Sequence, residues 1–145
     1  PHTAQVVTID IGDRTDIHPR NKRDVGERLA LAARHVAYGQ TLVHAGPTKR
    51  TVRFDGGKAT VEFDLQGSEL AVRGGGDLVR GFRVAGADRR FHDALARIEG
   101  GHIVVSSDAV AQPVAVRYAW SDAPEDADLI NLQQLPASPF RSDNW

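Results

Sequence analysis

The hydrophobic pattern divides the chain into two parts with different periodicities. Near the start, the β-branched residues Val6, Val7, Ile9 and Ile11 form an almost continuous apolar run. Such a run is typical of a strand that is covered on both faces, as in a parallel sheet. We therefore predict a buried strand over residues 5–11.

A helix is predicted next, over about residues 22–37. Its apolar residues recur at spacings of three and four and form one stripe: Val25, Leu29, Ala32, Ala33 and Val36. Asn21 can serve as its N-cap, and Asp24 with Glu27 offers an alternative capping pair. Gly39 lies where a residue in the left-handed conformation would end the helix. We interpret this strand and helix as the last two elements of an α/β sheet whose other strands are not in this chain.

From about residue 41 the pattern alternates with a period of two residues, as expected for strands with one buried face. The clearest alternation gives these inward positions: Ala59, Val61, Phe63 and Leu65, then Val114, Val116, Tyr118 and Trp120. Further short candidate strands lie at residues 50–54, 69–73, 79–85, 91–98 and 102–106. The segment 91–98 also has some helical character, but its surroundings favour a strand.

Glycine-rich turns separate these candidates at residues 55–57, 74–76 and 100–101, and we predict hairpin connections there. The periodicity is lost after residue 121, where three prolines follow. The expected fold class is thus α/β plus all-β. Residues 1–40 would be the C-terminal piece of an α/β domain, residues 41–122 an antiparallel β-sandwich, and residues 123–145 an extended tail.

Composition narrows the possible functions. The 145 residues are 41% hydrophobic and 26% charged, with a net charge of −1, which is typical of a globular domain. No basic stripe with interleaved aromatic residues is present, which argues against a nucleic-acid partner, and no apolar run is long enough for a membrane span. Cysteine is absent, which excludes disulfides and thiolate metal sites. Methionine is absent too and residue 1 is Pro1, so we expect the chain to be part of a longer polypeptide.

One histidine has a setting that favours catalysis. His18 lies in the loop between the predicted strand and helix, and ligands of open α/β sheets bind beyond the carboxyl ends of the strands. Asp16 precedes it by two residues, and Asp13 and Asp10 are also near. A carboxylate beside an imidazole fixes its tautomer and stabilises the imidazolium formed when it takes a proton from a serine. The alternative is a solvated loop in which the aspartates cap turns.

The other histidines favour structural roles, because they lack a second ligand at short spacing: His2, His35, His44, His92 and His102. No His-x-His or His-Glu-x-x-His pattern occurs, so we expect no metal site and no cofactor. None of the serines lies in a nucleophile elbow. We therefore expect the nucleophile to lie outside this chain.

Two longer stretches carry a resemblance to a known family. Residues 10–13 and 16–30, with the sequences DIGD and DIHPRNKRDVGERLA, resemble the closing catalytic block of the sialate O-acetylesterase family. Residues 113–122 (PVAVRYAWSD) and 135–145 (LPASPFRSDNW) are similar to its C-terminal end, and residues 81–88 (GFRVAGAD) fit between them. The resemblance follows the family's own order along nearly the whole chain.

The resemblance implies an SGNH hydrolase, in which a flavodoxin-like catalytic domain is flanked by β-domains. It implies hydrolysis of acetyl esters on sialic acid or on polysaccharide sugars, with His18 as the general base and Asp16 as its partner. The wider hydrolase group uses Asp-x-x-His, but Thr15 lies three residues before His18, which leaves Asp13 as an alternative acid. The serine nucleophile and the oxyanion-hole donors would belong to an N-terminal polypeptide of the same enzyme.

The resemblance also implies a secreted or periplasmic location, or a lysosomal one in a eukaryote. The rival interpretation is a non-catalytic carbohydrate-binding β-sandwich. It would account for residues 41–120, but it gives the segment around Asp16 and His18 no role.

Overall fold

A computed structural model describes residues 2–145 of the chain, so residue 1 of the predicted first segment lies outside it. One helix and eleven strands are formed among the described residues. They are α1 (Lys22–Val36), β1 (Thr48–Asp55), β2 (Lys58–Asp64), β3 (Leu70–Val72), β4 (Leu78–Val79), β5 (Phe82–Ala85), β6 (Phe91–Asp93), β7 (Leu95–Glu99), β8 (His102–Ser106), β9 (Ala115–Tyr118), β10 (Leu129–Asn131) and β11 (Phe140–Arg141).

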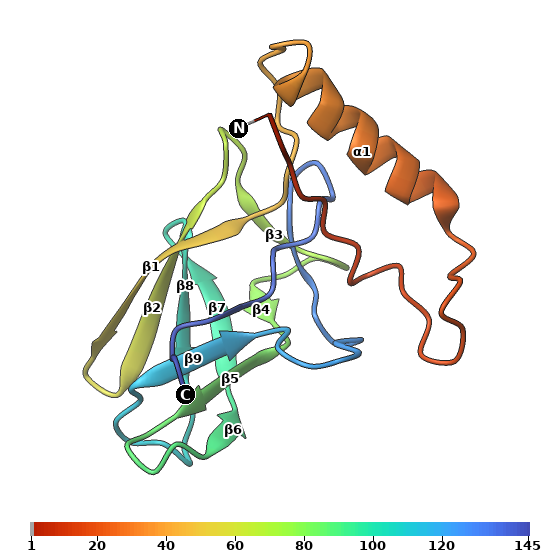
Figure 1. The fold of residues 1–145 in the computed structure, drawn as a ribbon. Helices are drawn as coiled ribbons and strands as arrows, with labels where there is room; N and C mark the ends of the chain where they lie inside the picture. The colour runs from red at the N-terminus through yellow and green to blue at the C-terminus, as the bar shows by residue number, and fades with distance from the viewer. Residues whose placement is uncertain (1) are drawn as a thin grey trace.

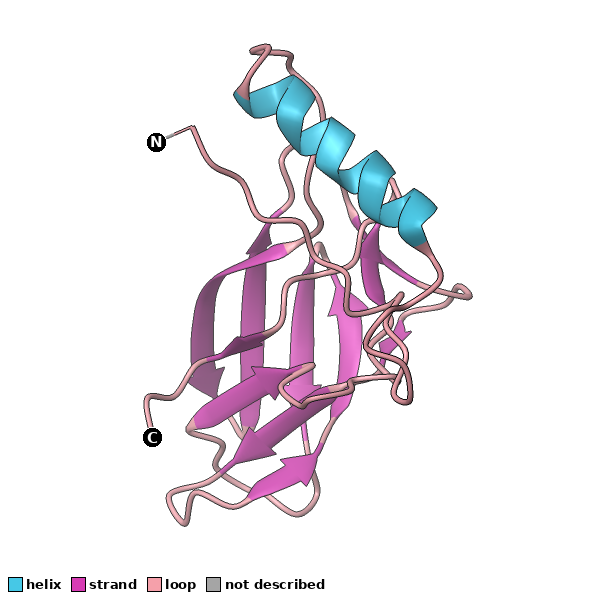
Figure 2. Ribbon diagram, turned by 45° about the vertical axis from the view of Figure 1, so that its right-hand side comes forward, coloured by secondary structure: helices cyan, strands magenta, loops and turns pink. Residues whose placement is uncertain are grey.

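The strands form three antiparallel sheets, an arrangement consistent with the predicted β-sandwich. The first sheet has the order β1-β2-β8-β7-β4, the second β11-β9-β5-β6, and β10 pairs with β3 in the third. The two larger sheets lie face to face, and α1 lies beyond one end of them (Figure 1, Figure 2).

The core fills the space between the two larger sheets. Val61, Ile103 and Val105 point inward from β2 and β8, and they belong to one cluster with Val84 and Val116 of β5 and β9. All five are fully buried, and each such side chain contributes about 1.5–3 kcal/mol of hydrophobic stabilisation. The predicted alternation over residues 59–63 is therefore confirmed.

Several connections match their sequence signals. Gly56 and Gly57 join β1 to β2 with positive φ angles of 54° and 79°, which side-chain-bearing residues rarely adopt. The turn at residues 100–101 joins β7 to β8. The ambiguous segment 91–98 is not helical and forms two short strands, β6 and β7, which belong to different sheets. The helix begins and ends close to the predicted positions, with Asn21 as the N-cap.

Other predictions are wrong. Residues 5–11 form no strand, because no other strand among residues 2–145 lies alongside to pair with their backbone groups. The glycines at 74–76 do not close a hairpin, since β3 and β4 belong to different sheets. The single strand expected at 79–85 breaks at Gly81 (φ 90°), where the chain passes from the first sheet to the second.

The segment 123–145 is not a tail lying on the surface. It supplies β10 and β11, and Leu129, Ile130 and Ala137 are fully or almost fully buried. Asn131 is also fully buried, and its side-chain oxygen accepts hydrogen bonds from the backbone N–H groups of Gln133 and Leu135. Periodicity failed to reveal these strands because they are only three and two residues long.

Candidate active site

The loop before the helix is shaped by two aspartates that accept hydrogen bonds from the backbone. Oδ1 of Asp13 accepts from the N–H and the hydroxyl of Thr15, each at 2.8 Å, and from the N–H of Asp16 at 3.2 Å. Oδ1 of Asp16 in turn accepts from the N–H of His18 at 2.8 Å. These are consecutive aspartate-capped turns, so the loop has a defined local conformation. The hydrogen bonds to Thr15 hold the pKa of Asp13 below its usual value.

The structure brings the two predicted catalytic residues close together. Nδ1 of His18 lies 3.8 Å from Oδ1 of Asp16, which is beyond hydrogen-bond distance. The His18 side chain is 83% exposed, and that of Asp16 is about half exposed. Asp13, the alternative acid, uses its Oδ1 atom within the loop backbone rather than toward the imidazole.

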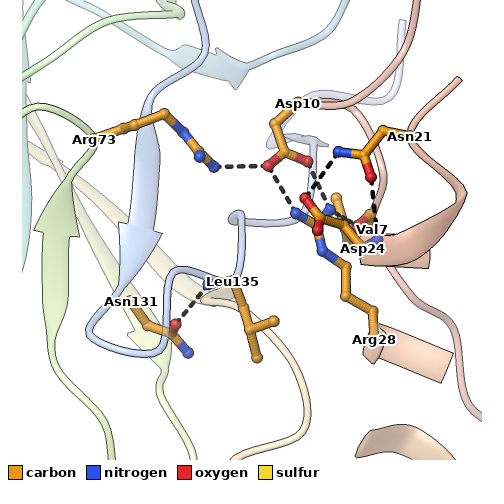
Figure 3. A network of polar contacts seen from close by, with 8 residues as sticks. All are labelled: Val7, Asp10, Asn21, Asp24, Arg28, Arg73, Asn131 and Leu135. Carbon is orange, nitrogen blue, oxygen red and sulfur yellow. Dashed lines mark hydrogen bonds and ion pairs between the residues drawn. The ribbon is translucent and has the colours of Figure 1, made fainter. Parts of the chain in front are cut away.

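A buried ion-pair cluster anchors the start of this loop (Figure 3). Both carboxylate oxygens of Asp10 accept from the guanidinium of Arg28 on α1, at 2.7 and 2.8 Å, and Arg28 also donates to the carbonyl of Val7 at 2.7 Å. Arg73, just after β3, donates to Oδ2 of Asp10 at 2.7 Å. One carboxylate thus joins the loop, the helix and the β-domain.

The chemistry of this cluster keeps Asp10 ionised. Its side chain is only 6% exposed, and burial acts to raise its pKa. The hydrogen bonds and charge of Arg28, together with the charge of Arg73, outweigh that effect, so the pKa of Asp10 is lowered. A bidentate pair of a carboxylate with arginine is also directional, so it fixes the position of the loop as well as its charge.

The other end of the loop is fixed by the helix cap. Oδ1 of Asn21 accepts from the N–H of Asp24 at 3.1 Å, and the Asn21 amide donates to the Asp24 carboxylate at 2.9 Å. His18 therefore lies in a loop that is anchored at Asp10 and again at Asn21. The helix itself is joined to the β-domain by His35, whose ring stacks on that of His44 with 3.9 Å between centroids.

A cleft opens beside this loop. It is lined by residues 12–14 and 119–125 together with Ile9 and Pro139, and its volume is about 530 Å³. We call it the loop cleft. Two of its lining residues, Arg14 and Glu125, form an ion pair at 3.5 Å. His18 is not among its lining residues.

Three of the six serines have side-chain hydrogen bonds with a structural role. The hydroxyl of Ser107 donates to the carbonyl of Asp93, that of Ser142 accepts from the N–H of Val116, and that of Ser68 donates to Gln133. Within residues 2–145 no serine hydroxyl is hydrogen-bonded to His18, and no group of three acidic or histidine side chains could hold a metal ion. No helix of the described chain has the length and apolar character needed to cross a bilayer.

Sequence reasoning did not identify Arg28 and Arg73. The buried residues of the helix are Arg28 and Ala32, whereas Leu29 of the predicted apolar stripe is exposed. The only sequence signal for the burial of Arg28 was its position next to Leu29 of the predicted apolar stripe. Arg73 follows a strand of only three residues, and nothing in its local sequence indicates a partner near residue 10.

The chain is similar to proteins named as acetylesterases. No protein-family model matches it. It is 30% identical to sialate O-acetylesterase of Mus musculus and 28% identical to that of Pongo abelii, in each case over 97% of the chain. The crystal structure of a carbohydrate acetylesterase from Xanthomonas citri superposes on 97% of the chain with a TM-score of 0.94 and 67% sequence identity.

The chain spans only part of each of these proteins. It covers 28% and 29% of the length of the two sialate O-acetylesterases and 32% of the Xanthomonas citri chain. The matches nevertheless include both the loop of Asp16 and His18 and the β-domain that follows it, because they cover 97% of the chain. Over the segment that it shares with these proteins, the chain belongs to the sialate O-acetylesterase family.

Proposed function

We propose that the chain is part of a serine-type carbohydrate O-acetylesterase and supplies its catalytic Asp16 and His18 together with a β-domain. The observation that carries the proposal is the match to the Xanthomonas citri carbohydrate acetylesterase, at 67% identity over 97% of the chain. The exposed imidazole of His18, 3.8 Å from a carboxylate in a doubly anchored loop, supports it. Catalytic hydrogen bonds are often long in the absence of substrate and shorten when it binds.

In the proposed reaction, Nε2 of His18 takes the proton of a serine hydroxyl while the serine oxygen attacks the acetyl carbonyl. Collapse of the tetrahedral intermediate releases the sugar hydroxyl, which receives that proton from His18. Water then attacks the acetyl-serine ester and loses a proton to His18; collapse of this intermediate releases acetic acid, and His18 returns the proton to the serine oxygen. Asp16 orients the imidazole and stabilises its protonated form.

The serine and the oxyanion-hole donors would come from the remaining, N-terminal part of such an enzyme. Three large apolar side chains support a polypeptide neighbour for residues 12–40: Ile17 is 90% exposed, Tyr38 75% and Leu29 52%. Exposed apolar surface that gathers on one segment commonly marks a surface that another polypeptide covers. As in the family generally, we place the enzyme in a secreted, periplasmic or lysosomal setting.

A chimera tests the proposal directly. The segment of the Xanthomonas citri enzyme that matches this chain is replaced by residues 1–145, and hydrolysis of 4-nitrophenyl acetate and of an acetylated oligosaccharide is measured. We expect an active chimera, and a loss of at least about a thousandfold in kcat for His18→Ala. His92→Ala serves as the control, because His92 lies in β6, away from the loop. If His18→Ala were as active as the control, the assignment would be wrong.

The 145-residue chain alone should not hydrolyse either ester. Esterase activity of the isolated chain would mean that it holds its own nucleophile. An inactive but well-folded chimera that still binds carbohydrate would instead favour the rival interpretation of a carbohydrate-binding β-sandwich.

A further inference from the structure

Trp120 is exposed, although the sequence pattern predicts that it is buried. Its alternation with Val116 and Tyr118 predicts a buried side chain, yet the indole is 51% exposed whereas Tyr118 is buried. The cause is Ala119, which has a φ of 50°. A left-handed residue between Tyr118 and Trp120 ends the alternation of β9, so the indole turns outward rather than into the core.

This conformation is unfavourable for alanine, at about 1–2 kcal/mol. Ala119 is itself buried and is fixed by a 3.0 Å hydrogen bond from its N–H to the carbonyl of Gly81, which holds the turn in place. Backbone strain of this kind is concentrated at functional sites. The fold therefore keeps a strained residue whose effect is to expose a tryptophan.

The exposed indole lies between two clefts. It lines the loop cleft, and it also lines a second cleft of about 560 Å³ formed by residues 78–83 and 93–96 with Arg117, which we call the strand cleft. The guanidinium of Arg141 lies 5.6 Å from the centroid of the Trp120 ring and covers one face of it. About half of Trp120 nevertheless stays exposed, and it belongs to the linings of both clefts.

We propose that the Trp120 face is a sugar-stacking subsite, which binds a neutral oligosaccharide extending from the loop cleft into the strand cleft. Pyranose rings present flat C–H faces, which pack on aromatic rings, and hydroxyl groups, which pair with the polar groups at a cleft rim. The proposal rests on the proposed function for its substrate class. It goes beyond that function by locating the sugar chain away from the acetylated position.

The charges at the subsite favour a neutral sugar over a sialic acid. The loop cleft holds the carboxylates Asp13, Asp122 and Glu125 against a single arginine, Arg14, which is paired with Glu125. An acid-bearing sugar would be repelled there.

In the strand cleft each lining arginine has a carboxylate partner among the described residues. Arg80 pairs with Asp128 at 2.7 Å, Arg83 with Asp93 at 3.0 Å, and Arg117 with Asp143 at 2.7 Å. The arginines of both clefts are therefore already engaged, and a sialate carboxylate would have to compete with a protein carboxylate for any of them. Hydroxyl groups, which can share a charged partner without displacing it, suit this surface better.

Fluorescence of the full 145-residue chain tests the subsite. The chain has two tryptophans, so Trp145→Phe leaves Trp120 as the single reporter. The probes are xylose to xylotetraose, glucose to cellotetraose, and N-acetylneuraminic acid. We expect saturable changes in emission with at least one of the neutral series, with affinity rising from the monosaccharide to the tetrasaccharide, and weaker binding of N-acetylneuraminic acid.

Calorimetry with the preferred tetrasaccharide gives the matched comparison. Trp120→Ala should lower the affinity at least about tenfold and Trp120→Phe by less, while Trp145→Ala, which alters an aromatic residue lining neither cleft, should leave it unchanged. Absence of saturable binding, an equal effect of Trp145→Ala, or tighter binding of N-acetylneuraminic acid would each overturn the proposal. So would a Trp120→Ala variant that binds sugar normally but prevents assembly of the chimera, since the indole would then cover a polypeptide.

Failure of this inference and failure of the proposed function give different results. If the subsite is wrong, the chimera still hydrolyses 4-nitrophenyl acetate but the chain binds none of the neutral sugars. If the esterase assignment is wrong, the chain binds sugar and the chimera hydrolyses neither ester.

Discussion

Arg73 donates a hydrogen bond of 2.7 Å to Oδ2 of Asp10, although 63 residues separate the two in the chain. Through this contact the β-domain holds the start of the loop that carries Asp16 and His18. The same carboxylate is bound by Arg28 of α1, so the helix and the sheets share one anchor. The β-domain therefore contributes to the position of the candidate catalytic residues as well as to stability.

The anchor predicts unequal effects for substitutions of Asp10 and Arg73. Asp10→Asn should lower the free energy of unfolding by about 3 kcal/mol or more, because it leaves the buried guanidinium of Arg28 without its charge partner. Arg73→Ala should cost about 1 kcal/mol or less, since its side chain is about half exposed. Urea unfolding followed by circular dichroism measures both. The exposed pair of Arg23 and Glu27 on α1 is the control, and Arg23→Ala should leave the free energy of unfolding essentially unchanged.

Arg73→Ala should also affect catalysis in the chimera. Loss of the contact frees one side of the loop, so we expect kcat to fall severalfold while KM for 4-nitrophenyl acetate changes little. Arg97→Ala is a matched control, because Arg97 is equally exposed and pairs with Asp77 at 2.9 Å, far along the chain from the loop. Equal kcat values for the two variants would show that the β-domain does not position the loop.

Substitution by asparagine should affect the two candidate acids differently, because Asp16 is proposed to act through its charge and Asp13 through its hydrogen bonds. Asp16→Asn removes the negative charge beside His18, and we expect kcat of the chimera to fall at least about a hundredfold. Asp13→Asn keeps the side-chain oxygen that accepts from Thr15 and Asp16, so activity should remain within a few fold of the parent. A silent Asp16→Asn with a damaging Asp13→Asn would reverse the assignment. The pH profile of kcat/KM separates a lost acid partner from a misfolded loop.

Acid should destabilise the chain through its paired carboxylates. The hydrogen bonds from Arg117 lower the pKa of Asp143, against a smaller opposing effect of burial, and its side chain is fully buried. A carboxylate with a lowered pKa in the folded state stabilises the fold above its unfolded pKa, near pH 4, and this contribution is lost as the pH falls through the folded value. The free energy of unfolding should therefore decrease below about pH 4. Asp143→Asn should reduce stability at pH 7 and flatten this decrease, whereas Asp108→Asn in an exposed turn should do neither.

Two glycines should respond oppositely to alanine. A Cβ at Gly46 would lie 1.9 Å from the carbonyl oxygen of Pro136 and 2.9 Å from that of Leu135, both backbone atoms. Gly46→Ala should therefore destabilise the chain by about 1–3 kcal/mol, as overpacking does. Gly26, inside α1, has no atom within 4 Å of the same position, so Gly26→Ala should stabilise it by about 0.5–1 kcal/mol. Thermal unfolding of the two variants and of the parent chain shows whether each substitution raises or lowers the stability.

What the sequence predicted well depended on local interactions. The helix was found through its cap at Asn21 and its stop at Gly39, which has a φ of 65°, and the first hairpin through Gly56 and Gly57. These signals act over a few residues, so they do not require knowledge of the rest of the fold. The candidate loop was located for the same reason, since Asp16 and His18 are two residues apart.

The errors arose where distant contacts decide the structure. The apolar run at residues 5–11 has the composition of a buried strand, but a strand exists only where a neighbour pairs with it. The alternation through Trp120 is broken by the left-handed backbone conformation of Ala119. Nothing in the local sequence predicts that an alanine adopts this conformation. Arg73 could not be connected with Asp10 from spacing, because the contact depends on where β3 lies relative to the helix.

The pairing of β3 with β10 has a consequence for biosynthesis. The strand β3 (residues 70–72) pairs with β10 (residues 129–131), and one edge of β9 pairs with β11 (residues 140–141). During translation the earlier strands therefore emerge with open edges, and the protein can reach its final form only after residue 141 has left the ribosome. Such long-range closure slows folding and leaves the nascent strands exposed to aggregation. Chaperones that bind extended apolar segments would be expected to meet this chain before it is complete.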